Sequence, residues 1–126
     1  MRIIGTGIDI VEISRIAKSY ERYAHNFASK ILHDGEILEL DAANNKNAFL
    51  AKRFAVKEAF VKALGTGIRD NVHWCKMYVQ HDDKGKPLLK FTAEFSKEIH
   101  ADEFDVHISI SDEKNYVVAQ ALITTI

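Results

Sequence analysis

The sequence predicts an α+β domain in which a mainly antiparallel sheet packs on one long central helix. Helical patterns gather in the first half of the chain and strand patterns in the second, an order typical of this class. The longest regular pattern is the helix expected over residues 46–64. Because the chain has 126 residues, of which 47% are hydrophobic, we expect one modest core and a single domain over residues 1–126.

The chain is expected to begin with a strand over residues 3–13, with Asp9 inside it. Its residues alternate between two sides, one with Gly7, Asp9 and Val11 and the other with Ile8 and Ile10. We expect Ser14 to cap a helix that ends near Ala24. Two short helical segments follow, over residues 26–32 and 34–43.

The helix over residues 46–64 has the clearest boundaries, since Asn45 is suited to cap its start and Gly65 to end it. Mainly strand patterns follow it. The expected elements are a strand over 72–80, a turn over 82–87, a strand over 88–92, a helix over 93–101, and strands over 105–111 and 116–125. We expect the strands over 72–80 and 88–92 to form a hairpin.

Charged residues interrupt the apolar face of the long helix. Arg53 and Lys57 fall in the middle of its apolar arc, where charges are uncommon. The opposite side carries alanines at positions 51, 55, 59 and 63, which allow another backbone to approach closely. Glu58 and Lys62 lie one turn apart at the edge of the arc, where they could form an ordinary surface ion pair.

Asp9 and Glu58 are carboxylates in apolar or small-residue surroundings, where an unpaired charge is costly. Each therefore needs a partner, and Arg53, Lys57 or a hard cation could serve. Two carboxylates together with substrate phosphates and waters are typical ligands of magnesium. The pattern indicates a magnesium site, with structural ion pairing as the alternative.

A glycine-rich turn, Gly65-Thr66-Gly67, follows the long helix and Lys62. Its backbone N–H groups could approach a phosphate, although a helix C-terminal cap is the commoner meaning of such a turn.

Arg15, Lys18 and Arg22 share one face of the first predicted helix. The chain as a whole has 17 basic and 18 acidic residues, so it has no global basic field that would recruit nucleic acid. A local basic stripe on a slightly acidic chain can steer an acidic protein partner, and a merely solvated helix face is the alternative.

The chain shows no sign of export or membrane insertion. Cys75 is its single cysteine, which excludes an intramolecular disulfide framework and is typical of a reducing compartment. The first residues lack the apolar stretch of a signal peptide, and no run approaches the roughly 18 apolar residues of a membrane span. We therefore expect a soluble, cytoplasmic protein.

Two ordered motifs stand at residues 7–15, GIDIVEISR, and at residues 53–67, RFAVKEAFVKALGTG. Both resemble the signatures of holo-(acyl-carrier-protein) synthases, which are 4'-phosphopantetheinyl transferases. The resemblance extends to the Gly85-Lys86-Pro87 turn and to residues 107–111, HISIS, so it covers essentially the whole chain.

The resemblance implies the α+β fold of the 4'-phosphopantetheinyl transferases and a homotrimer with active sites between subunits. It implies that Asp9 and Glu58 hold magnesium together with the coenzyme A pyrophosphate. Lys62 resembles the lysine that contacts the phosphates, beside the loop of Gly65, Thr66 and Gly67.

Other positions match the family's substrate-binding residues. Four resemble parts of the adenosine and 3'-phosphate pocket, namely Arg53, Gly85, Pro87 and His107. Arg15 and Arg22 match basic positions that meet the acidic recognition helix of the carrier protein, and Lys18 is added from its spacing alone. Asp112 departs from the family, which often has histidine there.

The function implied is transfer of the 4'-phosphopantetheine group from coenzyme A to a serine of apo acyl carrier protein, for fatty acid synthesis, with release of 3',5'-bisphosphoadenosine. Asp9, Glu58 and Lys62 would be the catalytic residues. The base that takes the serine proton could be Glu58, Asp9 or a metal-bound water. Two rival functions are a non-catalytic module that binds an acidic protein and a different magnesium-dependent enzyme acting on a nucleotide.

Overall fold

The computed structural model describes residues 1–65 and 74–126. The regular elements in these ranges are β1 (Ile3–Glu12), α1 (Ile13–Tyr23), α2 (His25–Ile31), α3 (Asp34–Ala42), α4 (Lys46–Leu64), the 3-10 turn η1 (Trp74–Lys76), β2 (Met77–His81), β3 (Pro87–Phe91), α5 (Ala93–Glu98), the 3-10 turn η2 (Ala101–Glu103), β4 (Phe104–Asp112) and β5 (Tyr116–Thr125). In the described part of the chain, no helix is long and apolar enough to cross a bilayer.

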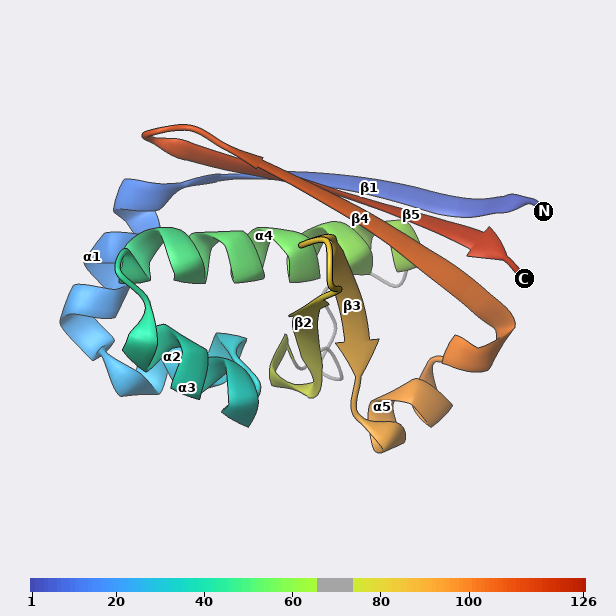
Figure 1. The fold of residues 1–126 in the computed structure, drawn as a ribbon, viewed down its shortest axis with the longest axis horizontal. Coiled ribbons are helices and arrows are strands. Elements are labelled where there is room, and N and C mark those ends of the chain that lie inside the picture. The colour runs from blue at the N-terminus through green and yellow to red at the C-terminus, as the bar shows by residue number, and fades with distance from the viewer. Residues whose placement is uncertain (66–73) are drawn as a thin grey trace.

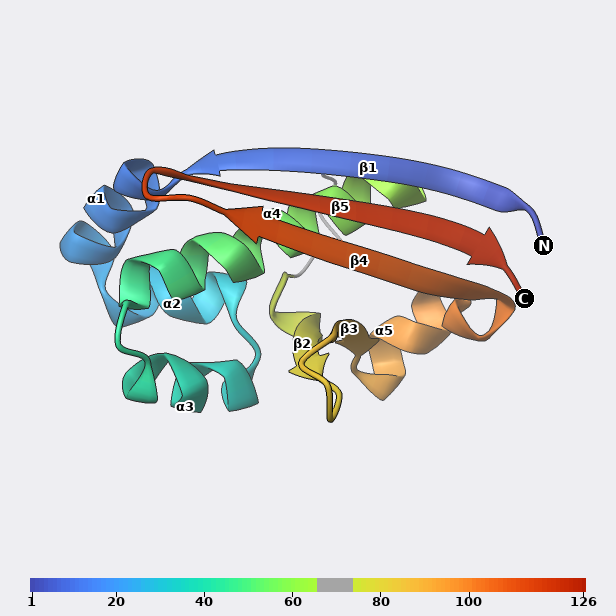
Figure 2. The ribbon, with the colours of Figure 1, turned by 45° about the horizontal axis from the view of Figure 1, so that its top comes forward.

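An antiparallel sheet joins the two ends of the chain. β5 is its central strand, with β1 on one side and β4 on the other. α4 runs lengthwise under one face of this sheet, and α1, α2 and α3 gather at one end (Figure 1). β2 and β3 form a separate hairpin on the side of α4 away from β1 (Figure 2). The predicted α+β class with a central helix is confirmed.

β1 lies unusually close to α4, and two glycines make this possible. A Cβ on Gly5 would overlap the carbonyl oxygen of Ala63, and a Cβ on Gly7 would overlap that of Ala59. The predicted role of the alanine side of α4, to let another backbone approach, is confirmed. The close approach fixes which residues of β1 face the helix.

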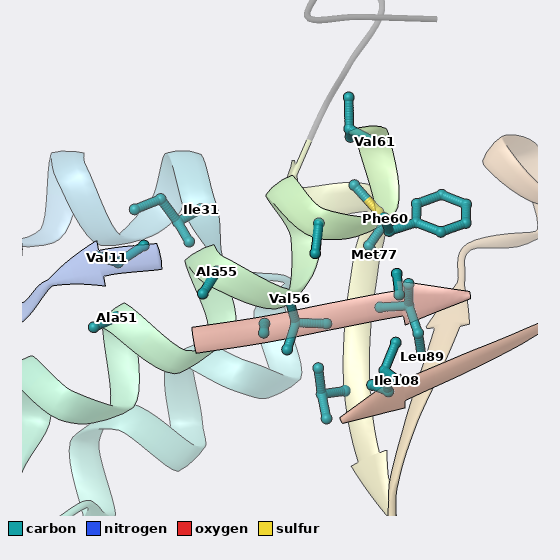
Figure 3. Packing of buried hydrophobic residues seen from close by; sticks show 14 of the residues in the cluster. Val11, Ile31, Ala51, Ala55, Val56, Phe60, Val61, Met77, Leu89 and Ile108 are labelled. Atoms are coloured by element: carbon teal, nitrogen blue, oxygen red, sulfur yellow. The ribbon is translucent and has the colours of Figure 1, made fainter. Parts of the chain in front are cut away.

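The core lies between α4, the sheet and the hairpin. Val56 and Phe60 of α4 pack with Met77 and Leu89 of the hairpin and Ile108 of β4, as Figure 3 shows. Each of these large side chains is at most 7% exposed, so each contributes about 1.5–3 kcal/mol of hydrophobic stabilisation. This packing attaches the hairpin to the helix.

The helix predictions were confirmed where capping residues mark the ends. α4 spans Lys46–Leu64, the Asn45 side chain accepts the Ala48 N–H at 3.0 Å, and Gly65 has the left-handed φ of 81°. The prediction that Ser14 caps α1 was wrong. β1 runs directly into the helix, so Ser14 lies in the first turn and its hydroxyl donates to Glu12.

The strand prediction over residues 72–80 was partly wrong. Residues 72 and 73 lie outside the described ranges, and Trp74–Lys76 forms a 3-10 turn before β2 begins at Met77. The Trp74 ring packs 5.7 Å from the Phe54 ring, a tertiary contact that the local pattern does not encode. The helix predicted over 93–101 ends at Glu98, because His100 takes a left-handed φ of 57°.

The sheet has a second face that α4 does not cover, which we call the outer sheet face. Ile8 and Ile10 of β1 lie on it and are 62% and 65% exposed, whereas Gly7 and Val11 are buried against the helix. Their neighbours across β5 and β4 include Val118, Leu122 and His107. The predicted alternation of the first strand is confirmed, and its apolar outer side is exposed in the single chain.

Candidate active site

The approach of β1 to α4 brings Asp9 beside Lys62 and Glu58. The Lys62 ammonium donates to the Asp9 carboxylate at 3.1 Å and to the Ile8 carbonyl at 3.0 Å. The Asp9 side chain is 15% exposed and that of Lys62 is 55% exposed. The three catalytic candidates thus meet at a solvent-accessible edge, and Lys62 pairs with Asp9 instead of with Glu58 on its own helix.

The Glu58 carboxyl has an altered affinity for its proton. Burial raises the pKa of Glu58 above its ordinary value, the neighbouring charge of Asp9 raises it further, and Lys62 lowers it in part. Like charges brought together in a partly buried place favour the neutral form of one of them. Lys62 therefore offsets only part of the effect that burial and the Asp9 charge have on the pKa of Glu58.

These two carboxylates fit a magnesium ion. Magnesium is held by one or two carboxylates, with substrate phosphates and waters completing its shell. In residues 1–65 and 74–126 no group of three or more His, Cys, Asp or Glu side chains is placed to hold a metal by itself. The remaining ligands would have to come from substrate phosphates and water, which matches the chemistry expected of this ion.

A groove of about 350 Å³ begins at Asp9 and runs along α1. Its lining consists of Asp9, Ile10, Val11, Glu12, Arg15, Ile16, Ser19, Phe27 and Phe54. Most of these side chains are apolar, and the charged groups are Asp9, Glu12 and Arg15. The groove connects the carboxylate site with the basic face of α1.

The three basic candidates on α1 all project into solvent. Arg15, Lys18 and Arg22 are exposed, and the Arg22 guanidinium stacks 5.3 Å from the centre of the Tyr23 ring. In the described part of the chain none of the three takes part in an ion pair. Their charges are available to an acidic partner.

The loop after α4 is described only at its start. Gly65 closes the helix, and its N–H donates to the carbonyls of Val61 and Lys62, both at 3.2 Å. Thr66 and Gly67, the other predicted phosphate-loop residues, lie outside the described residues.

The structure does not bring three of the adenosine-pocket candidates to Asp9 within one chain. Gly85 lies in the β2–β3 turn, which Asp82 organises by accepting two backbone N–H groups at 2.9 Å, and Pro87 is the first residue of β3. His107 lies on the outer sheet face, opposite the side of Asp9, and contacts Thr124 at 3.2 Å. Their roles stay predictions.

Arg53 and Lys57 are buried, as their place in the apolar arc predicted, but neither pairs with Asp9 or Glu58. Both contact Glu36 of α3, with the Lys57 ammonium at 2.6 Å and the Arg53 guanidinium at 3.2 Å. Arg53 also reaches Glu39 at 3.2 Å and stacks on the Phe49 ring. The role of Arg53 in the adenosine pocket stays a prediction.

Glu36 was missed by the sequence reasoning. Two buried cations without an assigned anion were the available signal, because such charges are retained only when paired. A second signal is the start of α3, where the Glu36 side chain accepts the His33 N–H as part of a capping box.

Asp112, which departs from the family pattern, forms an ion pair with Lys52 of α4 at 3.6 Å. Both side chains are more than a third exposed, so this pair contributes little to stability.

Comparisons with known proteins point to the same family that the sequence motifs resemble. Residues 5–121 match the model of the 4'-phosphopantetheinyl transferase superfamily. The chain is 43% identical to a holo-[acyl-carrier-protein] synthase of Vibrio cholerae, covering 96% of this chain and 97% of that protein. It is 41% identical to one from Dechloromonas aromatica, with 96% and 97% covered.

Solved structures give the same result. The holo-[acyl-carrier-protein] synthase of Neisseria meningitidis superposes with a TM-score of 0.91 at 39% identity, covering 98% of this chain and 99% of that chain. The synthase of Bacillus anthracis, solved in complex with CoA (3',5'-ADP), has a TM-score of 0.82 at 35% identity and full coverage of both chains.

Proposed function

The chain belongs to the holo-(acyl-carrier-protein) synthase family of 4'-phosphopantetheinyl transferases and is therefore an enzyme, and we propose that it transfers 4'-phosphopantetheine from coenzyme A to a serine of an apo acyl carrier protein. The observation that carries this proposal is the meeting of Asp9, Glu58 and Lys62 where β1 lies on α4. The products are the holo carrier protein and 3',5'-bisphosphoadenosine.

Asp9 and Glu58 would hold a magnesium ion at the pyrophosphate end of coenzyme A. When bound, this ion would neutralise pyrophosphate charge and make the β-phosphorus more electrophilic. Lys62 turns from Asp9 to the phosphates and stabilises the negative charge that builds on the leaving phosphate. The serine proton leaves to a nearby base, for which Asp9, Glu58 and a water are the candidates.

The carrier protein docks on α1. Arg15, Lys18 and Arg22 attract its acidic surface, and the groove between Arg15 and Asp9 leads from the docking face to the carboxylates. This continuity favours the transferase over a small-molecule enzyme acting on a nucleotide, which has no use for the basic face.

The working enzyme is a homotrimer with composite sites. The apolar outer sheet face, with Ile8 and Ile10 exposed, supports association because large apolar patches are costly in water. His107 on that face could then reach a neighbouring subunit's coenzyme A. A cytoplasmic location and a role in fatty acid synthesis complete the proposal, in line with the single cysteine and the family's carrier substrate.

Intact-mass analysis tests the reaction. An apo acyl carrier protein incubated with the enzyme, coenzyme A and magnesium is expected to gain the mass of one phosphopantetheine, and EDTA should abolish the gain. A competent carrier that gains no mass would support the binding-module alternative instead. Turnover of coenzyme A without carrier would support the nucleotide-enzyme alternative.

A further inference from the structure

The Glu36 carboxylate is a buried junction of three structural elements, α3, α4 and β2. Its side chain is 1% exposed, and its two oxygens contact four groups. Oε1 lies 2.6 Å from the Lys57 ammonium and 3.1 Å from the His33 N–H. Oε2 lies 3.2 Å from the Arg53 guanidinium and 3.0 Å from the Val79 N–H. A carboxylate this deep is stable only because all these partners are in place.

The contact with Val79 ties the hairpin to the helices. Val79 belongs to β2, and β2 pairs with β3 alone in the described sheets. Glu36 Oε2 accepts the Val79 N–H on the open edge of β2, where a further strand would otherwise pair. Packing of His33 on the Tyr78 ring, at 4.7 Å, reinforces the same junction. Glu36 thereby sets where the hairpin lies along α3 and α4.

The contact with Lys57 ties the same carboxylate to the catalytic helix. Lys57 precedes Glu58, and its ammonium also donates to the Ile31 carbonyl at 2.6 Å. Together with Arg53, Lys57 fixes the rotation of α4 from the side facing α3. That rotation decides how Glu58 and Lys62 are presented to Asp9.

We propose that Glu36 is a positioning residue that holds the β2–β3 hairpin, with Gly85 and Pro87, at a fixed place relative to Glu58 and Lys62 of the same chain. The inference rests on the proposed function, in which one subunit's Gly85 and Pro87 bind one end of coenzyme A and a neighbouring subunit's Glu58 and Lys62 bind the other. Glu36 touches neither end itself. It fixes the spacing between the two contributions that each chain makes to the composite sites.

Glu36→Gln tests this role, because an amide has one accepting oxygen instead of two and loses the charge that pairs with Lys57 and Arg53. At a temperature where the variant is folded, the KM for coenzyme A should rise and kcat/KM for coenzyme A should fall at least about tenfold, since a misplacement of about 1 Å can cost up to about a hundredfold. The KM for the apo carrier protein should stay unchanged, because α1 supplies that surface.

Leu40→Ala is the matched control. Leu40 is 2% exposed on the same helix, so its truncation destabilises α3 without touching the carboxylate junction. It should lower Tm while leaving both KM values at the wild-type level. If Glu36→Gln does not fold, Glu36→Asp, which keeps the charge and shortens the reach, is measured in the same way.

The outcomes separate the two proposals. If the wild-type protein does not modify the carrier in the mass assay, the proposed function is refuted. An active wild type with unchanged coenzyme A kinetics in a folded Glu36 variant would overturn the positioning role alone. A fall in kcat with both KM values unchanged would also overturn it, since loss of correctly folded enzyme gives that result.

Discussion

At the scale of single residues, Glu58 should make the free energy of unfolding depend on pH. Its pKa is raised in the folded protein, so the folded state holds this proton more tightly than the unfolded state does. That stabilisation is complete below the ordinary value of 4.5 and is lost as the pH rises through the folded-state pKa. At neutral pH the ionised side chain therefore costs stability.

Glu58→Gln should raise Tm in metal-free buffer at neutral pH, because the amide carries no charge to desolvate or to repel Asp9. The gain should shrink as the pH falls toward 4.5. Thermal unfolding across this pH range measures the difference. A gain that is absent at neutral pH, or that grows on acidification, would contradict the proposed crowding of the two carboxylates.

Arg15 gives a kinetic prediction for the docking face. Arg15→Glu reverses a charge on exposed α1, so the KM for the carrier protein should rise about tenfold, which corresponds to a loss of about 1.4 kcal/mol of docking free energy. Coenzyme A affinity should change little. Lys97→Glu on α5 is the control and should leave both values unchanged. Unaltered carrier kinetics for Arg15→Glu would refute docking through α1.

The sequence reasoning recognised unusual residues more reliably than it paired them. Arg53 and Lys57 stood out because helical periodicity places them in an apolar arc. Their partner Glu36 lies 21 positions before Lys57, and only the placement of α3 against α4 brings the two together. For Lys62 the sequence offered Glu58 on the same helix as one possible partner, and it could not offer Asp9, because local spacing contains no information about β1.

At the scale of elements, the contact of β1 with α4 is the feature on which the site depends. Gly7→Ala should destabilise the protein by about 3 kcal/mol, because its Cβ meets the Ala59 carbonyl of a rigid backbone. The shift of β1 should also reduce transfer activity in the folded fraction. Denaturant unfolding and the carrier assay measure the two effects.

Gly35→Ala is the control for this substitution. A Cβ on Gly35 meets only the His33 ring nitrogen, at 3.7 Å, and alanine favours helix by about 1 kcal/mol over glycine. Its stability should be unchanged or slightly higher. If Gly7→Ala were as well tolerated, the close approach of β1 to α4 would not be needed.

Elements whose ends carry capping residues were predicted well, whereas elements whose ends depend on tertiary packing were not. α4 was predicted to the residue because Asn45 and Gly65 mark its ends. The onset of β2 was not, since Trp74–Lys76 turns in a 3-10 conformation while its aromatic ring packs on Phe54. The local sequence, which is rich in β-forming residues, contains no information about that contact.

At the scale of the whole molecule, the outer sheet face leads to a prediction about assembly. Ile10→Arg places a charge on this apolar face, so it should shift the proposed trimer toward monomers in sedimentation analysis and lower activity with it. Leu38→Arg is the control, since Leu38 is 72% exposed on α3, away from the sheet. A wild type that sediments as a monomer would contradict the trimer outright.

The fold class could be predicted, and Asp9, Glu58 and Lys62 could be singled out, because the motifs at residues 7–15 and 53–67 are local in the sequence. How the proposed trimer would share His107, Gly85 and Pro87 could not be derived from periodicity, since the pattern of one chain contains no distances between subunits.

The most direct test of the account is the magnesium dependence of carrier modification by Asp9→Asn and Glu58→Gln. Each should raise the magnesium concentration for half-maximal rate at least about tenfold, the lower end of what loss of even an outer-shell partner costs. Glu98→Gln, a variant of an exposed carboxylate on α5, should keep the wild-type requirement. Normal turnover of both Asp9→Asn and Glu58→Gln at low magnesium would show that these carboxylates do not hold the metal.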